Sequence, residues 1–453
     1  MRSHQAILSA LLLVAAACSD SGHGRPAPPA PEAINVPPFA MGQPDAVLLV
    51  TGSTDGMMEV CNCSGPMPGG LARRSGLVIS YRKAFPDRTV LIDTGDVFWI
   101  KPQDVRNRYV LKGYRQMGYD AVVLGDQEWA APDAMLAEVM PPGETAWLST
   151  TVASKQAEVP LARVVRRQLG NTKLAIVSDI RPDAFLFFDA ARQDELDFMP
   201  RNALRQIMQQ LKADRFAVVA VVHGSGEELE QAAGEMPADV ILRGHSQQSA
   251  KELLAAAGKP VVKVGGSEHL AALALRISPS GEVTDTEYRL EVVGDTWPLD
   301  KRMLELYQAY AHEAMRIALD AKREKSFDMV PSAQCGQCHA YQYKMWKQSP
   351  HAHAYESLQR VGRTTDPNCV GCHTLGFGME GGFYTVETTP KLAGVHCQNC
   401  HRVGYEEHVQ SPAATPKVTD EVCTSCHTPV TDPTFNEKRK QRFHDLGCGP
   451  ASE

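Results

Sequence analysis

The chain lacks any block of basic residues. Its 453 residues include 46 Lys and Arg against 53 Asp and Glu, which gives a formal net charge of -7 without clustering of either sign. This composition argues against nucleic acid as a partner, because phosphate binding needs a basic surface. Long apolar runs are also scarce. Outside the N-terminus no segment is apolar enough to cross a membrane.

Cysteine, in contrast, occurs in a regular pattern. The motif C-x-x-C-H appears four times, as Cys335-Gly-Gln-Cys338-His339, Cys369-Val-Gly-Cys372-His373, Cys397-Gln-Asn-Cys400-His401 and Cys423-Thr-Ser-Cys426-His427. Two thiols at this spacing can form thioethers with both vinyl groups of one porphyrin, and the His that follows lies under the iron. Zinc also binds such thiol pairs, but it does not need a His after every second Cys. The pattern therefore predicts four haem c groups, with each motif His as the proximal ligand.

The sixth position of each iron decides its chemistry. A filled position indicates electron transfer, and an open position allows a ligand to bind. The remaining histidines of this region are the candidates for the distal side, namely His351, His353, His396, His408 and His444. Filling by His predicts low reduction potentials.

The N-terminus has the features of an export signal. Residues 1–17 contain a short apolar run that ends in small residues, and Cys18 follows directly. The run is too short to span a bilayer and predicts a signal peptide. A Cys at this point resembles the lipoprotein box of bacteria, so we expect Cys18 to carry lipid and the protein to be a membrane-anchored lipoprotein of the periplasm or outer membrane. The alternative is an ordinary signal peptide that contains a Cys. Residues 18–45 are rich in Pro and predict a tether.

Three further cysteines lie outside the haem motifs and the signal, namely Cys61, Cys63 and Cys448. A bridge between Cys61 and Cys63 would close a strained ring, and Cys448 is an alternative partner for either. One thiol would then remain free. A thiol site that faces the first domain's candidate metal pocket is a second interpretation.

Residues 46–296 alternate short apolar, β-branched runs with helical patterns. Strands are expected at residues 46–51, 89–92, 121–124, 174–177, 217–222, 240–242 and 261–264. Residues 71–84 and 202–213 have the periodicity of amphipathic helices. Apolar strands that alternate with helices predict a layered α/β domain whose strands are buried on both faces.

Acidic residues and histidines follow several of these strands. Asp96 and Asp126 come shortly after two of them, and His223 and His245 follow two others. Ligand sites in open α/β sheets lie at the carboxyl ends of strands. Carboxylate and imidazole groups gathered there predict a metal site. The alternative is that His223 and His245 only make hydrogen bonds at strand ends.

These residues resemble the motifs of the calcineurin-like metallophosphatases, and in particular of the 5′-nucleotidase branch, over most of residues 46–277. Residues 91–96 are similar to the motif whose last Asp bridges two metals, and residues 117–128 to the stretch that ends in Gly-Asn-His-Glu. His223 matches a lone His after a strand, and residues 244–247 resemble Gly-His-x-His. The resemblance implies a four-layer αββα sandwich.

The departures from these motifs affect mainly one of the family's two metal sites. Gln127 stands where the family has its catalytic His, Gln247 replaces a metal-binding His, and the opening Asp-x-His motif falls on Ser53-Thr54-Asp55. One metal site would keep Asp96, Asp126, His223 and His245, whereas the other would have no imidazole. Because cleavage of phosphoesters in this family uses both metals, we expect a degenerate scaffold that could hold one divalent metal ion.

A helix at residues 299–325 is expected to join the two domains, within a junction at 297–329. The remaining residues, 330–453, contain all four C-x-x-C-H motifs but few long apolar runs. A segment of this size and composition could not build a core of its own. The porphyrins are therefore expected to form the core of a mainly α-helical domain, and crowded haems should exchange electrons.

This C-terminal segment resembles the tetrahaem cytochrome c-554 family over nearly its whole length. The matching residues include Tyr343, Trp346, Ser349, His351 and Tyr355 after the first motif, residues 366–369 and 373–378 around the second, residues 392–397 before the third, His408 after the third, and Thr428, Phe435 and His444 after the fourth. The resemblance implies stacked haem pairs, mostly with two His ligands, and one haem without a distal protein ligand. It places His351, His408 and His444 at distal positions, with His353 and His396 spare. Arg402-Val403-Gly404 stands where the family has Gly-Pro-Gly.

Three functions follow from these features. The first is a lipid-anchored electron carrier that serves redox partner proteins outside the cytoplasm. The second is an oxidoreductase that acts on a small nitrogen compound at one open haem. The third is a metal-dependent hydrolase of phospho- or sulfo-esters with an attached electron-transfer domain.

Overall fold

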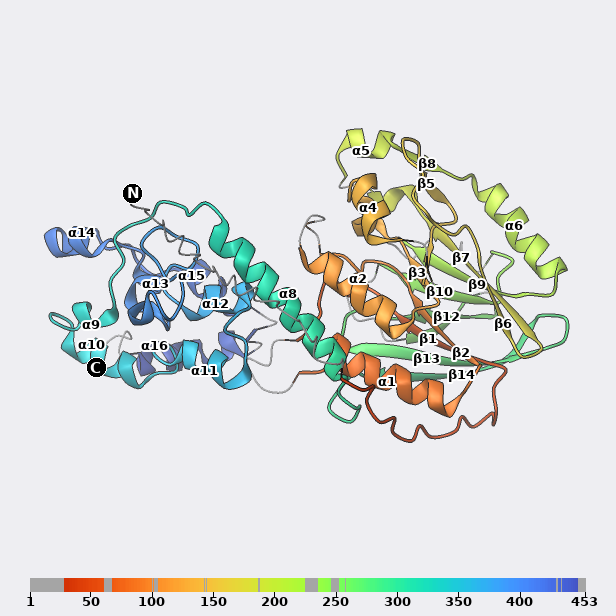
Figure 1. Cartoon of the computed structure of the whole chain (residues 1–453), viewed down its shortest axis with the longest axis horizontal. Coiled ribbons are helices and arrows are strands. Elements are labelled where there is room, and N and C mark those ends of the chain that lie inside the picture. The colour runs from red at the N-terminus through yellow and green to blue at the C-terminus, as the bar shows by residue number, and fades with distance from the viewer. Residues whose placement is uncertain are drawn as a thin grey trace, which may run out of the picture.

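The computed structural model describes residues 28–446 except for 61–66, 100, 102–104, 142, 144, 186–187, 225–234, 246–251, 257, 429–430 and 433. Figure 1 shows an α/β part and a smaller helical part, with the long helix α8 (Lys301–Asp320) running between them. Among the described residues, no helix is both long and apolar enough to cross a membrane.

The first sheet has six strands in the order β14-β13-β1-β2-β3-β4. Their bounds are Ala46–Thr51 (β1), Thr89–Asp93 (β2), Ala121–Val123 (β3), Ala146–Leu148 (β4), His269–Ile277 (β13) and Val283–Val292 (β14). Strands β1 to β4 are parallel, whereas β13 and β14 add an antiparallel hairpin to one side. All six residues of β1 are buried, because it lies between β13 and β2 and is covered on both faces.

The second sheet has the order β11-β12-β10-β9-β7-β6. Its strands are Val165–Leu169 (β6), Thr172–Ile180 (β7), Ala217–His223 (β9), Val240–Gly244 (β10), Glu252–Ala256 (β11) and Lys259–Lys263 (β12). The four inner strands are parallel, and β6 and β11 pair antiparallel at the edges. A separate antiparallel pair consists of β5 (Val152–Ser154) and β8 (Leu196–Phe198).

Strand β9 shows how the layers are built. Val219 and Val221 belong to the core between the two sheets, whereas Val218 and Ala220 pack with Leu204 of helix α6 (Arg201–Ala213) on the outer face. Successive side chains of a strand point to opposite faces, so an apolar residue at every position is required here. Both sheets are thus covered outside by helices, as the sequence predicts for a layered α/β domain.

Helices of the first domain follow the strands they connect. They are α1 (Leu71–Ala84), α2 (Val105–Met117), α3 (Asp126–Trp129), α4 (Asp133–Val139), α5 (Ala190–Asp194) and α6, with a 3-10 turn at Pro182–Phe185 (η1). In Figure 1, α1 and α2 lie against the same side of the first sheet, and α8 packs on both.

Helix α8 is shorter than residues 299–325. It begins after Asp300, whose carboxylate accepts a hydrogen bond from the Arg302 backbone N–H, and it ends at Asp320 because Ala321 is extended. Met303, Tyr307, Tyr310 and other residues on one face are buried. The opposite face stays in solvent, as expected for a helix that bridges two parts of a protein.

The C-terminal part is mainly helical. Its elements are α9 (Ser332–Cys335), α10 (Ala340–Gln348), α11 (Ala354–Val361), α12 (Pro367–His373), α13 (Cys397–His401), α14 (Tyr405–Gln410), α15 (Asp420–Thr424) and α16 (Phe435–Asp445), with 3-10 turns at Pro390–Leu392 (η2) and Pro412–Ala414 (η3). Its buried apolar cluster consists of Tyr355, Leu358, Val370, Leu375, Phe383 and Leu392. A cluster this small is consistent with the expectation that porphyrins supply most of the core.

Candidate functional site

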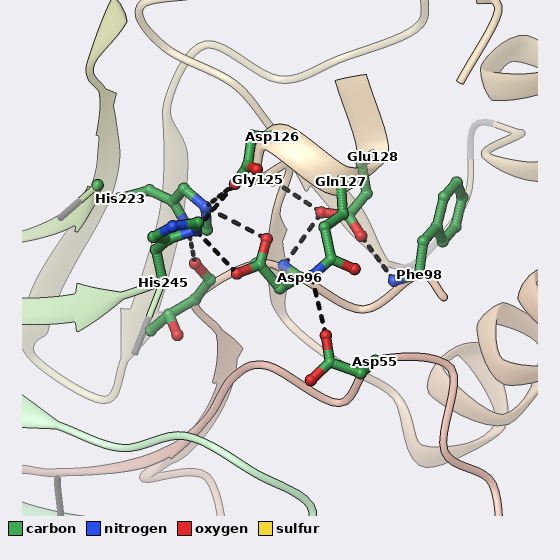
Figure 2. A network of polar contacts seen from close by, with 12 residues as sticks. Asp55, Asp96, Phe98, Gly125, Asp126, Gln127, Glu128, His223 and His245 are labelled. Atoms are coloured by element: carbon green, nitrogen blue, oxygen red, sulfur yellow. Dashed lines mark hydrogen bonds and ion pairs between the residues drawn. The ribbon is translucent and has the colours of Figure 1, made fainter. Parts of the chain in front are cut away.

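The four predicted metal ligands of the first domain meet at one place (Figure 2). Asp96 follows β2 and Asp126 begins α3 directly after β3, so both come from the first sheet. His223 is the last residue of β9 and His245 follows β10, so both come from the second sheet. The carboxyl ends of the parallel strands of both sheets therefore converge, which brings together residues that are far apart in the sequence.

The distances between these side chains are short. His223 Nε2 lies 2.9 Å from Asp126 Oδ1 and 3.3 Å from Asp96 Oδ1. His245 Nδ1 lies 3.0 Å from Asp126 Oδ1 and 3.3 Å from Asp96 Oδ2. One ligand atom from each of the four residues falls within 4.8 Å of all the others. We call these four residues the Asp-His cluster.

The tautomer of His223 is set by the backbone. Its Nδ1 lies 3.0 Å from the Thr94 carbonyl oxygen, to which it donates, so Nε2 faces the cluster and can offer its lone pair to a metal once the proton it carries without a metal has left. Burial lowers the pKa of His223, but the charge of Asp96 and the hydrogen bond to Asp126 outweigh burial and raise it well above the ordinary value. Burial raises the pKa of Asp96, and the two histidines more than offset this and depress it strongly. Without a metal, protons on the histidines neutralise the carboxylates.

The backbone around the cluster is shaped to bring these side chains close. Asp96 and His245 have positive φ angles of 60° and 57°, a conformation that non-Gly residues adopt rarely and mostly at functional sites. A Cβ at Gly125 would lie 2.6 Å from Asp96 Oδ1, and a Cβ at Gly244 would lie 2.7 Å from His223 Nδ1. Glycine is therefore required at both positions to leave room for the cluster.

The donor set fits a divalent metal ion. Two imidazole nitrogens and carboxylate oxygens are ligands that first-row transition metals accept. Asp96 Oδ1 and His245 Nδ1 are buried, and neither makes a hydrogen bond of good geometry within the described residues, although partners lie within 3.3 Å. Atoms that point at a common centre rather than at each other give this pattern.

The family's second metal site corresponds here to a hydrogen bond between two side chains. Gln127 Nε2 donates a hydrogen bond of 2.9 Å to Asp55 Oδ1, and the Asp55 backbone N–H donates to the Asp96 carbonyl oxygen at 2.9 Å. Burial raises the pKa of Asp55 to about 6. Gln247 lies outside the described residues. Ser53 is the remaining residue at this second site. Because the described residues of the site include no imidazole, they do not fit a second metal.

Glu128, which follows a predicted strand, has a role in shaping the cluster that reasoning from the sequence did not assign to it. Its carboxylate accepts hydrogen bonds from the backbone N–H groups of Asp96, Phe98 and Gly125, at 3.1, 2.7 and 2.8 Å. Complete burial and the nearby charge of Asp96 raise its pKa to about 8. Glu128 thereby fixes the two loops that carry Asp96 and Asp126. The similarity to a motif that ends in Glu was the signal that could have found it.

Metal binding by the cluster should depend on pH. The carboxylates of Asp126 and Asp96, whose oxygens lie 3.0 and 3.3 Å from its Nδ1, raise the pKa of His245 from 6.5 to about 9. In the metal-free protein this interaction stabilises the fold fully below pH 6.5, and the stabilisation is lost as pH rises through about 9. A metal must displace the proton, so the apparent affinity should rise about tenfold per pH unit between about pH 6 and 8 for each proton released. Titration with Mn²⁺ against a chelator would measure it, and an affinity independent of pH would contradict this assignment.

The C-x-x-C-H motifs each form a helical turn in the C-terminal part. The second and third motifs lie on α12 and α13. In the first and fourth, the His339 and His427 backbone N–H groups donate to the carbonyl oxygens of Cys335 and Cys423, both at 2.9 Å. Positions i, i+3 and i+4 of a helical turn share one face, so both thiols and the imidazole of each motif can address one porphyrin.

The motifs approach each other in two pairs. The thiol of Cys335 in the first motif lies close to that of Cys397 in the third. The thiol of Cys372 in the second motif likewise lies close to that of Cys426 in the fourth. This arrangement agrees with haem pairs, which the family resemblance implies.

Two predicted distal histidines face proximal ones. His408 Nε2 lies 3.4 Å from His339 Nε2, although the residues are 69 positions apart. Metal–nitrogen bonds of about 2 Å would put the two nitrogens roughly 4 Å apart across an iron, so the observed spacing needs little adjustment. The rings of His351 and His427 have centroids 6.0 Å apart.

Protein contacts orient several of these rings. His408 Nδ1 lies 2.6 Å from Thr415 Oγ1, and His427 Nδ1 lies 2.8 Å from Asp432 Oδ2. His373 Nδ1 lies 2.7 Å from the Ala354 carbonyl oxygen. Each contact occupies Nδ1 and leaves Nε2 for an iron, as is usual for metal-bound His.

The spare histidines are bonded within the protein. His396 Nδ1 accepts from the Ser332 backbone N–H at 3.1 Å, and its Nε2 lies 3.3 Å from the Ala393 carbonyl oxygen. His353 is exposed and contacts Glu356 and the Lys347 carbonyl oxygen with its two nitrogens.

Other predicted residues remain untested. His401 is half-buried, and burial together with the nearby His408 lowers its pKa. The side chain of His444 is outside the described part of the chain, as are Cys18, Cys61, Cys63 and Cys448. The predicted signal peptide, residues 1–17, is outside it as well.

Comparisons with known proteins divide the chain in the same way. Residues 334–402 match the family described as cytochrome c554 and c-prime. Over 86 residues the chain is 41% identical to cytochrome c-554 of Nitrosomonas europaea, a match that covers 16% of this chain and 36% of that protein. The aligned part is thus well short of the relative's full length. Residues 334–402 are thus similar to a family of c-type cytochromes, and the haem c that this similarity implies agrees with the C-x-x-C-H motifs.

The first domain is similar to solved metallophosphatase structures. A sulfate thiohydrolase of Thermus thermophilus superposes with a TM-score of 0.53 and 16% identity, covering 66% of this chain and 63% of that one. A 5′-nucleotidase precursor of Thermus thermophilus gives 0.50 and 20%, covering 63% and 62%. At this identity the similarity shows the fold, and the predicted metallophosphatase-like α/β class is confirmed.

Proposed function

We propose that the chain is a tetrahaem c-type cytochrome that carries electrons between redox partner proteins outside the cytoplasm, anchored by lipid on Cys18. The two facing pairs, His339 with His408 and His351 with His427, carry this proposal. Two imidazoles on one iron leave no open position, and such a haem exchanges electrons rather than substrates. Four C-x-x-C-H motifs support a count of four haems.

The first domain is proposed to act as a scaffold with one divalent metal ion rather than as a hydrolase. The Asp-His cluster supplies one complete ligand set, whereas Gln127 and Asp55 bond to each other on the other side. Hydrolysis with two metals uses the second ion to bind substrate or to activate water. A chain without that ligand set, and with Gln at the position of the catalytic His, should turn over phosphoesters very slowly.

An oxidoreductase with one open haem is the second candidate. Both nitrogens of His353 and of His396 have protein partners, so neither is poised to fill a distal position within the described residues. His408 faces the first motif and His351 faces the fourth. The described contacts include no distal ligand for the second or the third motif.

A potentiometric titration tests the carrier against the oxidoreductase. For the carrier we expect all haems to be reduced in steps at low potentials, because His/His ligation favours the ferric form. Cyanide or nitric oxide should change the spectrum of at most one haem in four. Rapid binding to most of the haems would instead contradict the carrier.

A further inference from the structure

The second haem motif is docked on the junction helix. Tyr307 of α8 donates a hydrogen bond of 2.6 Å to Asp366 Oδ2, and both side chains are buried. Asp366 also caps α12 by accepting from the Asn368 backbone N–H. Asn368 in turn donates to the Tyr310 hydroxyl at 3.1 Å. Because Cys369 follows Asn368 directly, these bonds fix the start of the motif relative to the first domain.

The other side of this junction is formed by a loop of the Asp-His cluster. The Gly56 backbone N–H donates to the Val97 carbonyl oxygen at 2.7 Å, beside the contact between Asp55 and Asp96. A Cβ at Gly56, whose φ is +68°, would lie 2.8 Å from the Arg106 side chain. The loop after β1 therefore packs directly on the stem of Arg106.

Arg106 connects this loop to the haem motif. Its guanidinium stacks over Trp99 at 4.8 Å from the ring centroid, and its Nη2 donates to Asn368 Oδ1 at 3.2 Å. Arg363 makes a second connection between the two domains. Its Nη2 lies 4.0 Å from Glu59 Oε1, and its guanidinium lies over the Tyr307 ring at 5.3 Å from the ring centroid.

These contacts form a continuous series. Asp96 contacts Asp55, the neighbouring Gly56 packs on Arg106, and Arg106 bonds to Asn368, which precedes Cys369. Every step is a hydrogen bond, a packing contact or a peptide bond. In Figure 1, α12 lies beside α8, on the side of the helical part that faces the first domain.

We propose that the junction makes the first domain an internal redox partner of the second haem motif. With iron in the Asp-His cluster, the junction would allow one electron to pass from a ferrous haem held at Cys369–His373 to Fe³⁺ held by the cluster, which would leave a ferric haem and Fe²⁺. Arg106 and Tyr307 are positioning residues that set the separation of the two sites. This inference rests on the proposed haem binding and adds a destination for the electrons.

The test uses the full-length holoprotein loaded with Fe²⁺ and then oxidised. After rapid reduction of the haems by a photochemical donor, the ferric EPR signal of the non-haem iron should disappear with a rate independent of protein concentration. R106A and Y307F should slow this decay several-fold while they keep their haem and non-haem iron contents. R316A is the matched control, because Arg316 pairs with Asp320 on an exposed face of the same helix, and its decay should be that of the unchanged protein.

Three outcomes would overturn the inference. They are a ferric signal that persists beside reduced haems, a decay rate that scales with protein concentration, and a cluster that takes up no iron. If the haems can still be reduced in these experiments, the proposed carrier function is not contradicted. Loss of haem itself would contradict the proposed function instead. Unchanged decay in both R106A and Y307F would remove the junction's role.

Discussion

Replacing His408 by alanine is expected to convert one haem in four from a low-spin to a high-spin ferric state. His408 Nε2 faces His339 Nε2 at 3.4 Å, and its Nδ1 is held by Thr415. Removing the imidazole leaves the iron of the first motif with a single protein ligand, and an open position weakens the ligand field. EPR of the oxidised protein, together with a haem count, would measure the change.

The matched control for this variant is His353→Ala. His353 is also a predicted distal candidate in the same domain, but its nitrogens contact Glu356 and a backbone carbonyl in an exposed position. We expect its spectrum to stay low-spin to the same extent as the unchanged protein. If His408→Ala gave no new high-spin iron while His353→Ala did, the assignment of distal ligands would have to be exchanged.

Replacing Asp96 by asparagine should abolish metal binding in the first domain. Asp96 places its two carboxylate oxygens toward both histidines of the cluster, so the substitution removes both a ligand and a negative charge. Loss of a group outside the coordination shell already costs about 10–100-fold in affinity, and loss of a ligand should exceed the upper end of that range. Metal analysis after dialysis, expressed per covalent haem, would show the loss.

Asp55→Asn provides the control for Asp96→Asn. Asp55 lies in the same pocket, but its carboxylate bonds to Gln127 and it is not part of the cluster. The protein should therefore keep its metal when Asn stands at position 55. An equal loss in both variants would mean that the metal sits between Asp96 and Asp55, as in the two-metal family members, and would contradict a site made by the Asp-His cluster alone.

The predicted strands agree best with the structure where their composition is decisive. Residues 217–222 are all apolar and β-branched or Ala, and they form most of β9. The hairpin of β13 and β14 was not predicted. Strand β13 is rich in Ala and Leu, which favour helices when no partner is present, and it becomes a strand because it pairs with β1. Strand β14 is half exposed and polar, so it has no apolar run.

The sequence predicted which residues form the candidate sites, but not which of their side chains contact each other. Asp96, Asp126, His223 and His245 follow strands, and parallel strands end at a common edge, so their meeting could be expected from the sequence. The bond between Gln127 and Asp55 could not be, because it depends on a loop in which Asp55 has a positive φ of 50°. The pairing of His408 with His339 spans 69 residues, and five distal candidates left it open.

A haem count on the purified mature protein tests the central claim most directly. The pyridine haemochrome of the denatured chain should show four covalently bound haems, one for each C-x-x-C-H motif. All proposals for the C-terminal part depend on this result, because the motif cysteines are otherwise free thiols that could hold zinc. A colourless protein with zinc in the thiol pairs would contradict the account.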